Sequence, residues 1–157
     1  MTPLNLPAIE AKIITSKGKK RIFDPVRKKY VVLTPEEWVR QHVISYLQHH
    51  LNYPRALIRV ESGLQVNSLN KRSDILVHDR EGKPWMLVEC KAPEIRVDQK
   101  AFNQVAIYNM TIGARFVAVT NGMAHFCCET FGPGTTPEFL KEFPEFGTGD
   151  LNNTTRS

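Results

Sequence analysis

The chain has 157 residues, with 21 lysines and arginines against 16 acidic residues, so its formal net charge is +5 at pH 7. This length suggests one domain with a substantial core, and the positive charge favours an anionic partner such as nucleic acid. No apolar run approaches membrane-spanning length, and the N-terminus lacks a signal-peptide pattern. We therefore expect a cytoplasmic protein with no membrane partner. Three cysteines without regular spacing predict reduced thiols, not disulfides or a zinc site.

The N-terminal segment is basic. Residues 1–10 contain prolines and predict a loose arm, and residues 11–33 alternate basic with apolar side chains. Two turn signals divide this stretch into short strands at about 11–15, 20–23 and 29–33, which predicts a β-hairpin extension. Two interpretations stand side by side: a surface that meets a phosphate backbone, or a sheet edge that lysines protect from pairing. The candidates for backbone contact are Lys17, Lys19, Lys20 and Arg21, with Arg72 further along the chain.

A helix is predicted from Pro35 to about His50. Thr34 is a suitable N-cap, Pro35 suits the first helical position, and Glu37 completes a capping box. A strand is predicted to follow over 56–66, and Glu61 can face a site on the next strand.

The most informative stretch runs from Lys71 to Pro93, KRSDILVHDREGKPWMLVECKAP. Two apolar runs flank a turn-like segment and predict a β-hairpin. Charged residues lie at the ends of these strands, where burial costs free energy unless the charges are paired or bind a metal. They are Asp74, Glu89 and Lys91.

The register of this hairpin decides whether the two carboxylates meet. If Asp79 pairs with Pro84, or a two-residue turn forms at Glu81-Gly82, Asp74 falls opposite Glu89. Opposed residues have Cβ atoms about 4.5–5.5 Å apart, close enough to share one divalent cation. An odd-length loop without a bulge would instead turn Asp74 to the other face of the sheet and break the site.

These residue types suit metal-assisted hydrolysis. Residues two apart on a strand share a face, so Glu89 and Lys91 lie roughly 7 Å apart on the same side. Two carboxylates beside a lysine form a hard-oxygen site for Mg²⁺, which can polarise a phosphoryl oxygen and acidify a bound water. The lysine can orient that water or offset developing negative charge. The pattern predicts phosphodiester hydrolysis.

The following segment predicts a second helix over 99–111, capped by Asp98. Gln104 lies on an apolar stripe with Val105 and Tyr108, so we expect its amide to be buried and hydrogen-bonded. Residues 115–120 predict a buried strand parallel to its neighbour.

Asn121-Gly122 predicts an antiparallel return over 123–129. Thr136-Pro137-Glu138 predicts a short helix to Phe143, with a flexible tail after it. We expect one domain over 1–135, with the basic hairpin at 11–33 and the core at 34–129, followed by the short helix and tail at 136–157.

These motifs resemble the PD-(D/E)XK nuclease superfamily. Ser73-Asp74 stands in the place of Pro-Asp, Glu89-Cys90-Lys91 is the E-x-K triplet, and residues 104–108 match the Q-x-x-x-Y motif of the RecB-like branch. The stretches IFDPVRKKYV, LTPEEWVRQ, SDILV, VECKAP, QVAIYN and VTNG further resemble the N-terminal domain of type I restriction enzyme R (HsdR) subunits. The resemblance covers residues 20–128.

The resemblance implies an α/β (α+β) restriction-endonuclease-like fold: an αβββαβ core whose mixed sheet is flanked by helices. It also implies a Mg²⁺-dependent DNA endonuclease, with Mn²⁺ able to substitute. The implied metal ligands are Asp74, Glu89 and the Cys90 carbonyl, with Glu37 and Glu61 as further candidates. Lys91 assists the attacking water, and Gln104 and Tyr108 support the site and the DNA strand.

Other interpretations remain open. A non-catalytic nucleic-acid-binding or assembly module can occupy the same fold, and a small α/β domain can carry such charges incidentally. The sequence has no G-x-x-x-x-G-K-[ST] loop, so ATP-driven translocation would need other restriction-modification subunits or a separate motor. The sequence does not indicate an oligomeric state.

Overall fold

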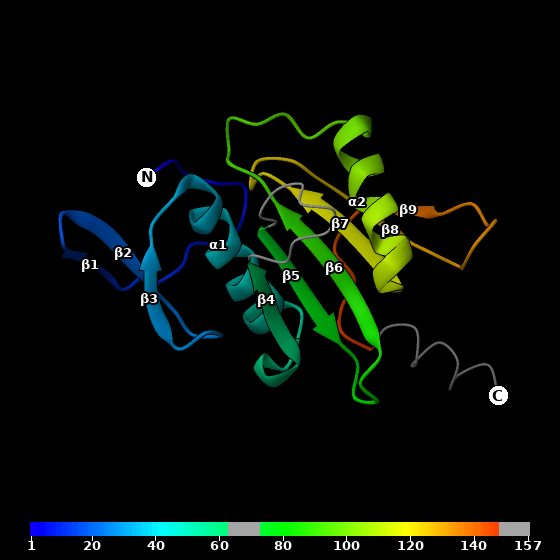
Figure 1. The fold of residues 1–157 in the computed structure, drawn as a ribbon, viewed down its shortest axis with the longest axis horizontal. Helices are drawn as coiled ribbons and strands as arrows, with labels where there is room; N and C mark the ends of the chain where they lie inside the picture. The colour runs from blue at the N-terminus through cyan, green and yellow to red at the C-terminus, as the bar shows by residue number, and fades with distance from the viewer. Residues whose placement is uncertain (63–72, 148–157) are drawn as a thin grey trace.

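The computed structural model describes residues 1–62 and 73–147, with the backbone alone at positions 61, 62, 73 and 74. Two sheets and two α-helices make up this part of the chain (Figure 1). The architecture is mixed α+β, as expected. None of the described helices is long and apolar enough to cross a membrane.

The basic segment forms an antiparallel sheet in the order β1-β2-β3, with β1 at Ile13–Ser16, β2 at Lys19–Asp24 and β3 at Lys29–Val32. The three predicted strands are therefore confirmed. Lys17 and Gly18 both have positive φ and make the tight turn between β1 and β2, as a two-residue hairpin loop requires.

Residues 1–10 are not a loose arm, contrary to the sequence prediction. Asn5 donates from its backbone N–H to the carbonyl of Gly122 at 2.8 Å, and the Trp38 indole donates to the carbonyl of Thr2 at 2.9 Å. Leu4 and Leu6 pack against the core. Leucine side chains and satisfied backbone groups hold the arm in place, although it has no regular secondary structure.

Helix α1 spans Pro35–His50, as predicted, and the Thr34 hydroxyl accepts a hydrogen bond from the Glu37 N–H at 3.0 Å. In a full capping box the Glu37 carboxylate would also accept a hydrogen bond from the Thr34 N–H, but here it has other partners. Instead, the Glu37 carboxylate accepts hydrogen bonds from Arg27 at 2.7 Å and from Arg40 at 2.5 Å. Arg27 also pairs with the fully buried Asp24. This cluster joins the N-terminal sheet to α1, because separating the partners would leave buried charges uncompensated.

The larger sheet has six strands in the order β4-β5-β6-β7-β8-β9. The pair β6–β7 is parallel and the other neighbours are antiparallel. A short 3₁₀ turn, η1, covers Arg55–Leu57 before the sheet begins. The strands are β4 Ile58–Ser62, β5 Ser73–His78, β6 Pro84–Cys90, β7 Phe116–Thr120, β8 His125–Glu129 and β9 Glu138–Leu140.

Helix α2 spans Gln99–Ile112 and connects β6 to its parallel neighbour β7. Asp98 caps it by accepting from the Ala101 N–H at 2.9 Å, and Gly113 ends it in the left-handed region. From α1 to β7 the elements follow the expected order of helix, three strands, helix and strand.

The two helices cover opposite faces of the large sheet (Figure 1). Under α1 the core contains Val43, Ile75 and Val88. Under α2 a second cluster contains Leu87, Phe102 and Val105. Because successive side chains of a strand point to opposite faces, these clusters assign each strand position to a face.

The predicted short helix over 136–143 is wrong. Residues 138–140 form strand β9, which pairs antiparallel with β8, so that Cys128 lies opposite Phe139. Phe143 is buried, as expected, but Phe139 is half exposed. Pairing with the otherwise open edge of β8 outweighs the local helix-start signal, and this segment completes the sheet. The predicted flexible tail lies outside the described residues from position 148 onward.

Candidate functional site

Three acidic residues fall in one row across three neighbouring strands. Glu61 on β4 pairs with Asp74 on β5, and Asp74 pairs with Glu89 on β6. Register partners lie on the same face of a sheet at the shortest cross-strand spacing. We call residues 61, 74 and 89 the acidic row. The predicted register of Asp74 against Glu89 is confirmed.

This register depends on a β-bulge. Neither predicted closure of the hairpin is observed: His78, and not Asp79, pairs with Pro84, so the loop has odd length, residues 79–83. The register then shifts between Val77 and His78, and Val77 pairs with Met86, which leaves Trp85 as the extra residue. An odd loop alone would have moved residue 74 to the other face, and the bulge restores the pairing.

Asp79 fixes the loop that precedes the bulge. Its carboxylate accepts hydrogen bonds from the backbone N–H groups of Glu81 and Lys83, each at 2.9 Å. Its own N–H donates to the Lys83 carbonyl at 2.7 Å. An aspartate that bonds the backbone two residues ahead is typical of turns. These hydrogen bonds hold the five-residue loop in one conformation.

The acidic row lies on the α2 face of the sheet. Leu87 belongs to the cluster under α2, whereas Val88 and Cys90 belong to the core under α1. Strand alternation therefore places Glu89 on the same face as Leu87. The row is near the end of β6, where the strand gives way to the loop that leads to α2.

Lys91, the first residue after β6, lies beside the acidic row. Its Nζ atom is 3.1 Å from Oε2 of Glu89, and the two side chains are 23% and 11% exposed. The Lys91 N–H donates to the carbonyl of Thr120 at 2.8 Å, which extends the ladder with β7 past the strand end. The two opposite charges therefore compensate each other where both side chains are largely buried.

Cys90 lies between these two residues with its side chain in the core under α1. Its thiol therefore faces away from the acidic row. Burial raises the pKa of the Cys127 thiol to about 12 and that of Cys128 to about 11. Both thiols stay protonated at neutral pH, so neither is poised as a nucleophile.

Helix α2 covers this face with a buried side and an exposed side. Tyr108 is 5% exposed and belongs to the cluster beneath the helix. Gln104 is exposed, so the expectation that its amide is buried was wrong. The buried side instead runs through Phe102, Val105 and Asn109. The buried face of α2 is therefore turned toward Phe102 and Asn109 and away from Gln104, which is exposed.

Glu37 is not brought to the acidic row. It begins α1, which packs on the other face of the sheet, and both of its carboxylate oxygens are engaged. Oε1 accepts from the two arginines, and Oε2 accepts from the Gln41 amide at 2.9 Å. These contacts join α1 to the N-terminal sheet, and Glu37 therefore lies apart from the site.

Among the side chains that the structure describes, no three histidine, cysteine, aspartate or glutamate residues cluster to hold a metal ion. The side chains of Glu61 and Asp74 are not among those described. For Glu61 and Asp74 the structure establishes the backbone pairing: Glu61 pairs with Asp74, and Asp74 pairs with Glu89.

The candidate DNA-backbone residues lie apart from the row. Lys17, Lys19 and Lys20 are exposed and Arg21 is half-buried, all on or beside the β1–β2 turn. In Figure 1 this sheet lies beside α1, at the opposite end of the molecule from α2. Arg72 lies outside the described residues.

Asn121 is a residue whose role the sequence analysis missed. Its amide donates to the carbonyls of Ile95 at 2.9 Å and Pro93 at 3.4 Å, in the loop that follows Lys91. Its Oδ1 accepts from the N–H groups of Met123 and Ala124. The Asn-Gly pair indicated a turn, and the antiparallel return is confirmed, but the asparagine also holds the loop beside the acidic row.

Residues 35–144, well over half of the chain, match the family model described as the type I restriction enzyme R protein N terminus (HSDR_N). The match begins at α1 and ends beyond β9. It therefore includes the acidic row and Lys91. No curated protein matches the chain.

We predict that Asn121→Ala lowers the free energy of unfolding by about 1–3 kcal/mol, because it removes the hydrogen bonds of a buried amide and leaves backbone groups unsatisfied. Urea denaturation measures this. Asn103→Ala is the matched control, since Asn103 is exposed on α2 and accepts a hydrogen bond from the neighbouring Gln99 at 2.8 Å; we expect a change within about 0.5 kcal/mol. Equal destabilisation of the two variants would show that Asn121 does not hold the loop.

Proposed function

The chain belongs to the family of type I restriction enzyme R protein N termini, and from this premise we propose that it is a Mg²⁺-dependent DNA endonuclease with a PD-(D/E)XK active site. A restriction-related role follows from the family. The finer assignment rests on one observation: the register pairs Asp74 with Glu89 on the face where Glu89 meets Lys91.

The residues at this site fit a hard divalent cation. Mg²⁺ prefers carboxylate, carbonyl and water oxygens and is commonly held by one or two carboxylates beside a phosphate. The acidic row offers carboxylate residues on adjacent strands. In the proposal Asp74 and Glu89 hold the ion with the Cys90 carbonyl, and Glu61 supplies a further carboxylate. Mn²⁺ has the same ligand preference and can substitute.

When bound, Mg²⁺ supplies Lewis-acid polarisation of the phosphoryl oxygen and a water of lowered pKa. Lys91 orients the attacking water through its ammonium group, and its positive charge offsets the negative charge that develops on the phosphate. Glu89 in turn holds Lys91 in place through their 3.1 Å ion pair. The water loses a proton as its oxygen bonds to phosphorus, and the leaving oxygen gains a proton as its bond to phosphorus breaks, which gives one phosphate end and one hydroxyl end.

Tyr108 and Gln104 take different parts in this proposal. Tyr108 points from α2 into the buried cluster beneath the helix and supports the face that carries the acidic row. Gln104 is exposed on the same helix and can contact the DNA strand. Other restriction-modification subunits or a separate motor would supply any ATP-driven movement along DNA.

We predict that Asp74→Ala, Glu89→Ala and Lys91→Ala each reduce Mg²⁺-dependent cleavage by about 100-fold or more, since each removes a charge that acts on the reacting phosphate. The assay incubates purified protein with plasmid, linear and single-stranded DNA, with and without Mg²⁺ or Mn²⁺. Circular dichroism checks that each variant is folded.

The same hairpin contains a matched control. Glu81 and Lys83 are also spaced as E-x-K, but they lie in the loop at the far end of the hairpin, 3.9 Å apart and largely exposed. Glu81→Ala and Lys83→Ala should cleave as the parent does. A Lys91→Ala variant that cuts DNA as well as the parent protein would refute the catalytic assignment. A parent protein that binds DNA but never cuts it would favour the non-catalytic binding module.

A second prediction concerns the basic β1–β2 hairpin. Replacing Lys17, Lys19 and Lys20 together with alanine should weaken DNA binding, because each lysine that neutralises a phosphate releases counterions. The slope of log affinity against log salt should flatten by roughly 0.9 for each phosphate that the variant no longer neutralises. Fluorescence anisotropy over a salt series measures this slope, with Lys141→Ala as the exposed lysine control. An unchanged slope would mean that these lysines only protect the edge of the sheet.

A further inference from the structure

The N-terminal arm, residues 1–10, is attached to the turn between β7 and β8. Asn5 donates its backbone N–H to the carbonyl of Gly122 at 2.8 Å and its side-chain amide to the carbonyl of Met123 at 2.9 Å. The Leu4 side chain fills the space beside Gly122, because a Cβ atom on this glycine would lie only 2.9 Å from Cδ2 of Leu4. Backbone and side-chain hydrogen bonds and an apolar contact therefore join the arm to this turn.

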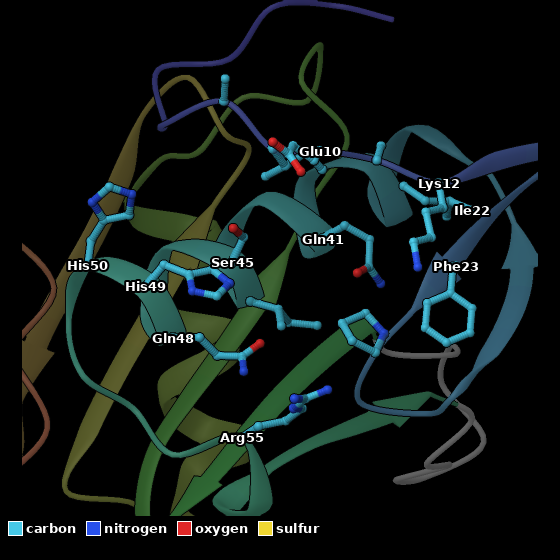
Figure 2. Close-up of a pocket in the computed structure, with 15 residues that line it drawn as sticks. Glu10, Lys12, Ile22, Phe23, Gln41, Ser45, Gln48, His49, His50 and Arg55 are labelled. Carbon is cyan, nitrogen blue, oxygen red and sulfur yellow. The ribbon is translucent and has the colours of Figure 1, made fainter.

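The arm and the residues after it have two further attachments. The Trp38 indole of α1 donates to the carbonyl of Thr2, and the Phe23 N–H of β2 donates to the carbonyl of Lys12, each at 2.9 Å. Between these attachments, residues 8–12 line a cavity of about 570 Å³ together with α1 and β2 (Figure 2). The first half of the arm thus reaches the turn, whereas the second half crosses a cavity.

The same turn holds the loop that follows Lys91. The carbonyl of Met123 accepts from the arm, and its N–H donates to Oδ1 of Asn121 at 2.9 Å. The Asn121 amide in turn donates to the carbonyl of Ile95 at 2.9 Å, and the Lys91 N–H donates to the carbonyl of Thr120 at 2.8 Å. A chain of hydrogen bonds therefore runs from the arm through the turn to the loop, and all three meet at the end of the sheet where β6 and β7 finish (Figure 1).

The outer part of this chain of contacts is exposed and the inner part is buried. Asn5 is exposed, whereas Asn121 is only 7% exposed. Exposed hydrogen bonds with few buried contacts around them open locally, without unfolding of the whole protein. We therefore expect loss of the arm contacts to loosen the turn and the loop while the core stays folded.

We propose that the N-terminal arm positions Lys91 for catalysis, with Leu4 and Asn5 acting as positioning residues through the β7–β8 turn. The arm lies outside residues 35–144, which match the family model, so the match itself assigns it no role. The consequence for cleavage rests on the proposed nuclease function, whereas the link from the arm to the loop does not.

Amide hydrogen exchange, measured by NMR on the whole chain without divalent cations or DNA, tests this link. Asn5→Pro removes both hydrogen bonds to the turn, because proline has neither an N–H nor an amide side chain. The Lys91 N–H should then exchange faster by about 10-fold or more, beyond any change at the N–H of Ala118, which is fully buried in the middle of β7. Leu4→Ala should act in the same direction. Leu4→Met keeps an apolar side chain of similar volume and should exchange as the parent does.

Two further variants serve as controls. Glu10→Ala changes an exposed arm side chain beside the cavity (Figure 2) and should exchange as the parent does. Tyr53→Phe removes a hydrogen bond to the Pro144 carbonyl near the start of β6 and lowers the stability of the whole protein, so it should not speed Lys91 more than Ala118. Asn5→Pro would overturn the proposal if both amides exchanged equally faster, or if neither changed.

The cleavage assay gives the second readout. Asn5→Pro should lower kcat by about 10-fold and leave KM for DNA unchanged, because a displaced Lys91 slows the chemical step. Glu10→Ala and Tyr53→Phe should keep the kcat of the parent. Faster Lys91 exchange with an unchanged kcat in Asn5→Pro would overturn the positioning role. A parent protein that never cuts DNA would refute the proposed nuclease alone, since hydrogen exchange decides the link between arm and loop.

Discussion

The candidate site depends on the register between β5 and β6. Side chains alternate along a strand, so a shift of one residue would send Asp74 and Glu89 to opposite faces of the sheet. The loop has odd length, and taken alone it would produce that shift. The bulge at Trp85 compensates for it, and it has a second effect: Trp85 and Met86, consecutive in sequence, both pack into the core under α1. The same irregularity therefore aligns the acidic row and fills the core behind it.

Hydrogen bonds to β7 and to the residue after it hold the end of β6, its parallel neighbour. The Lys91 backbone donates to Thr120, and Asn121, the next residue after β7, holds the loop that follows Lys91. A parallel strand pair joined by α2 brings these two strand ends to the same edge of the sheet. Lys91 can thus leave the regular ladder and still meet Glu89. The position of a charged side chain at a strand end is set by backbone hydrogen bonds on a neighbouring strand.

Much of this arrangement could be predicted from local patterns. Thr34 and Asp98 identify their helix starts because a cap is a contact between residues three apart, and the apolar runs of the hairpin identify β5 and β6. Long-range contacts could not be predicted in this way. Thr136-Pro137-Glu138 has a helix-start pattern, but the segment pairs with an edge strand that only the folded sheet provides. Glu37 fits a capping box, yet Arg27 reaches its carboxylate from the turn between β2 and β3. Gln104 was assigned to the buried side of α2, but that side is turned toward Phe102 and Asn109 and leaves Gln104 exposed.

The most direct test of the account is a crystal structure with Mn²⁺, located by its anomalous scattering. The account predicts one ion bonded to carboxylate oxygens of both Asp74 and Glu89 at about 2.1 Å, on the face of the sheet that α2 covers. An ion bound elsewhere with these two carboxylates unoccupied, or carboxylates directed to opposite sides of the sheet, would contradict it.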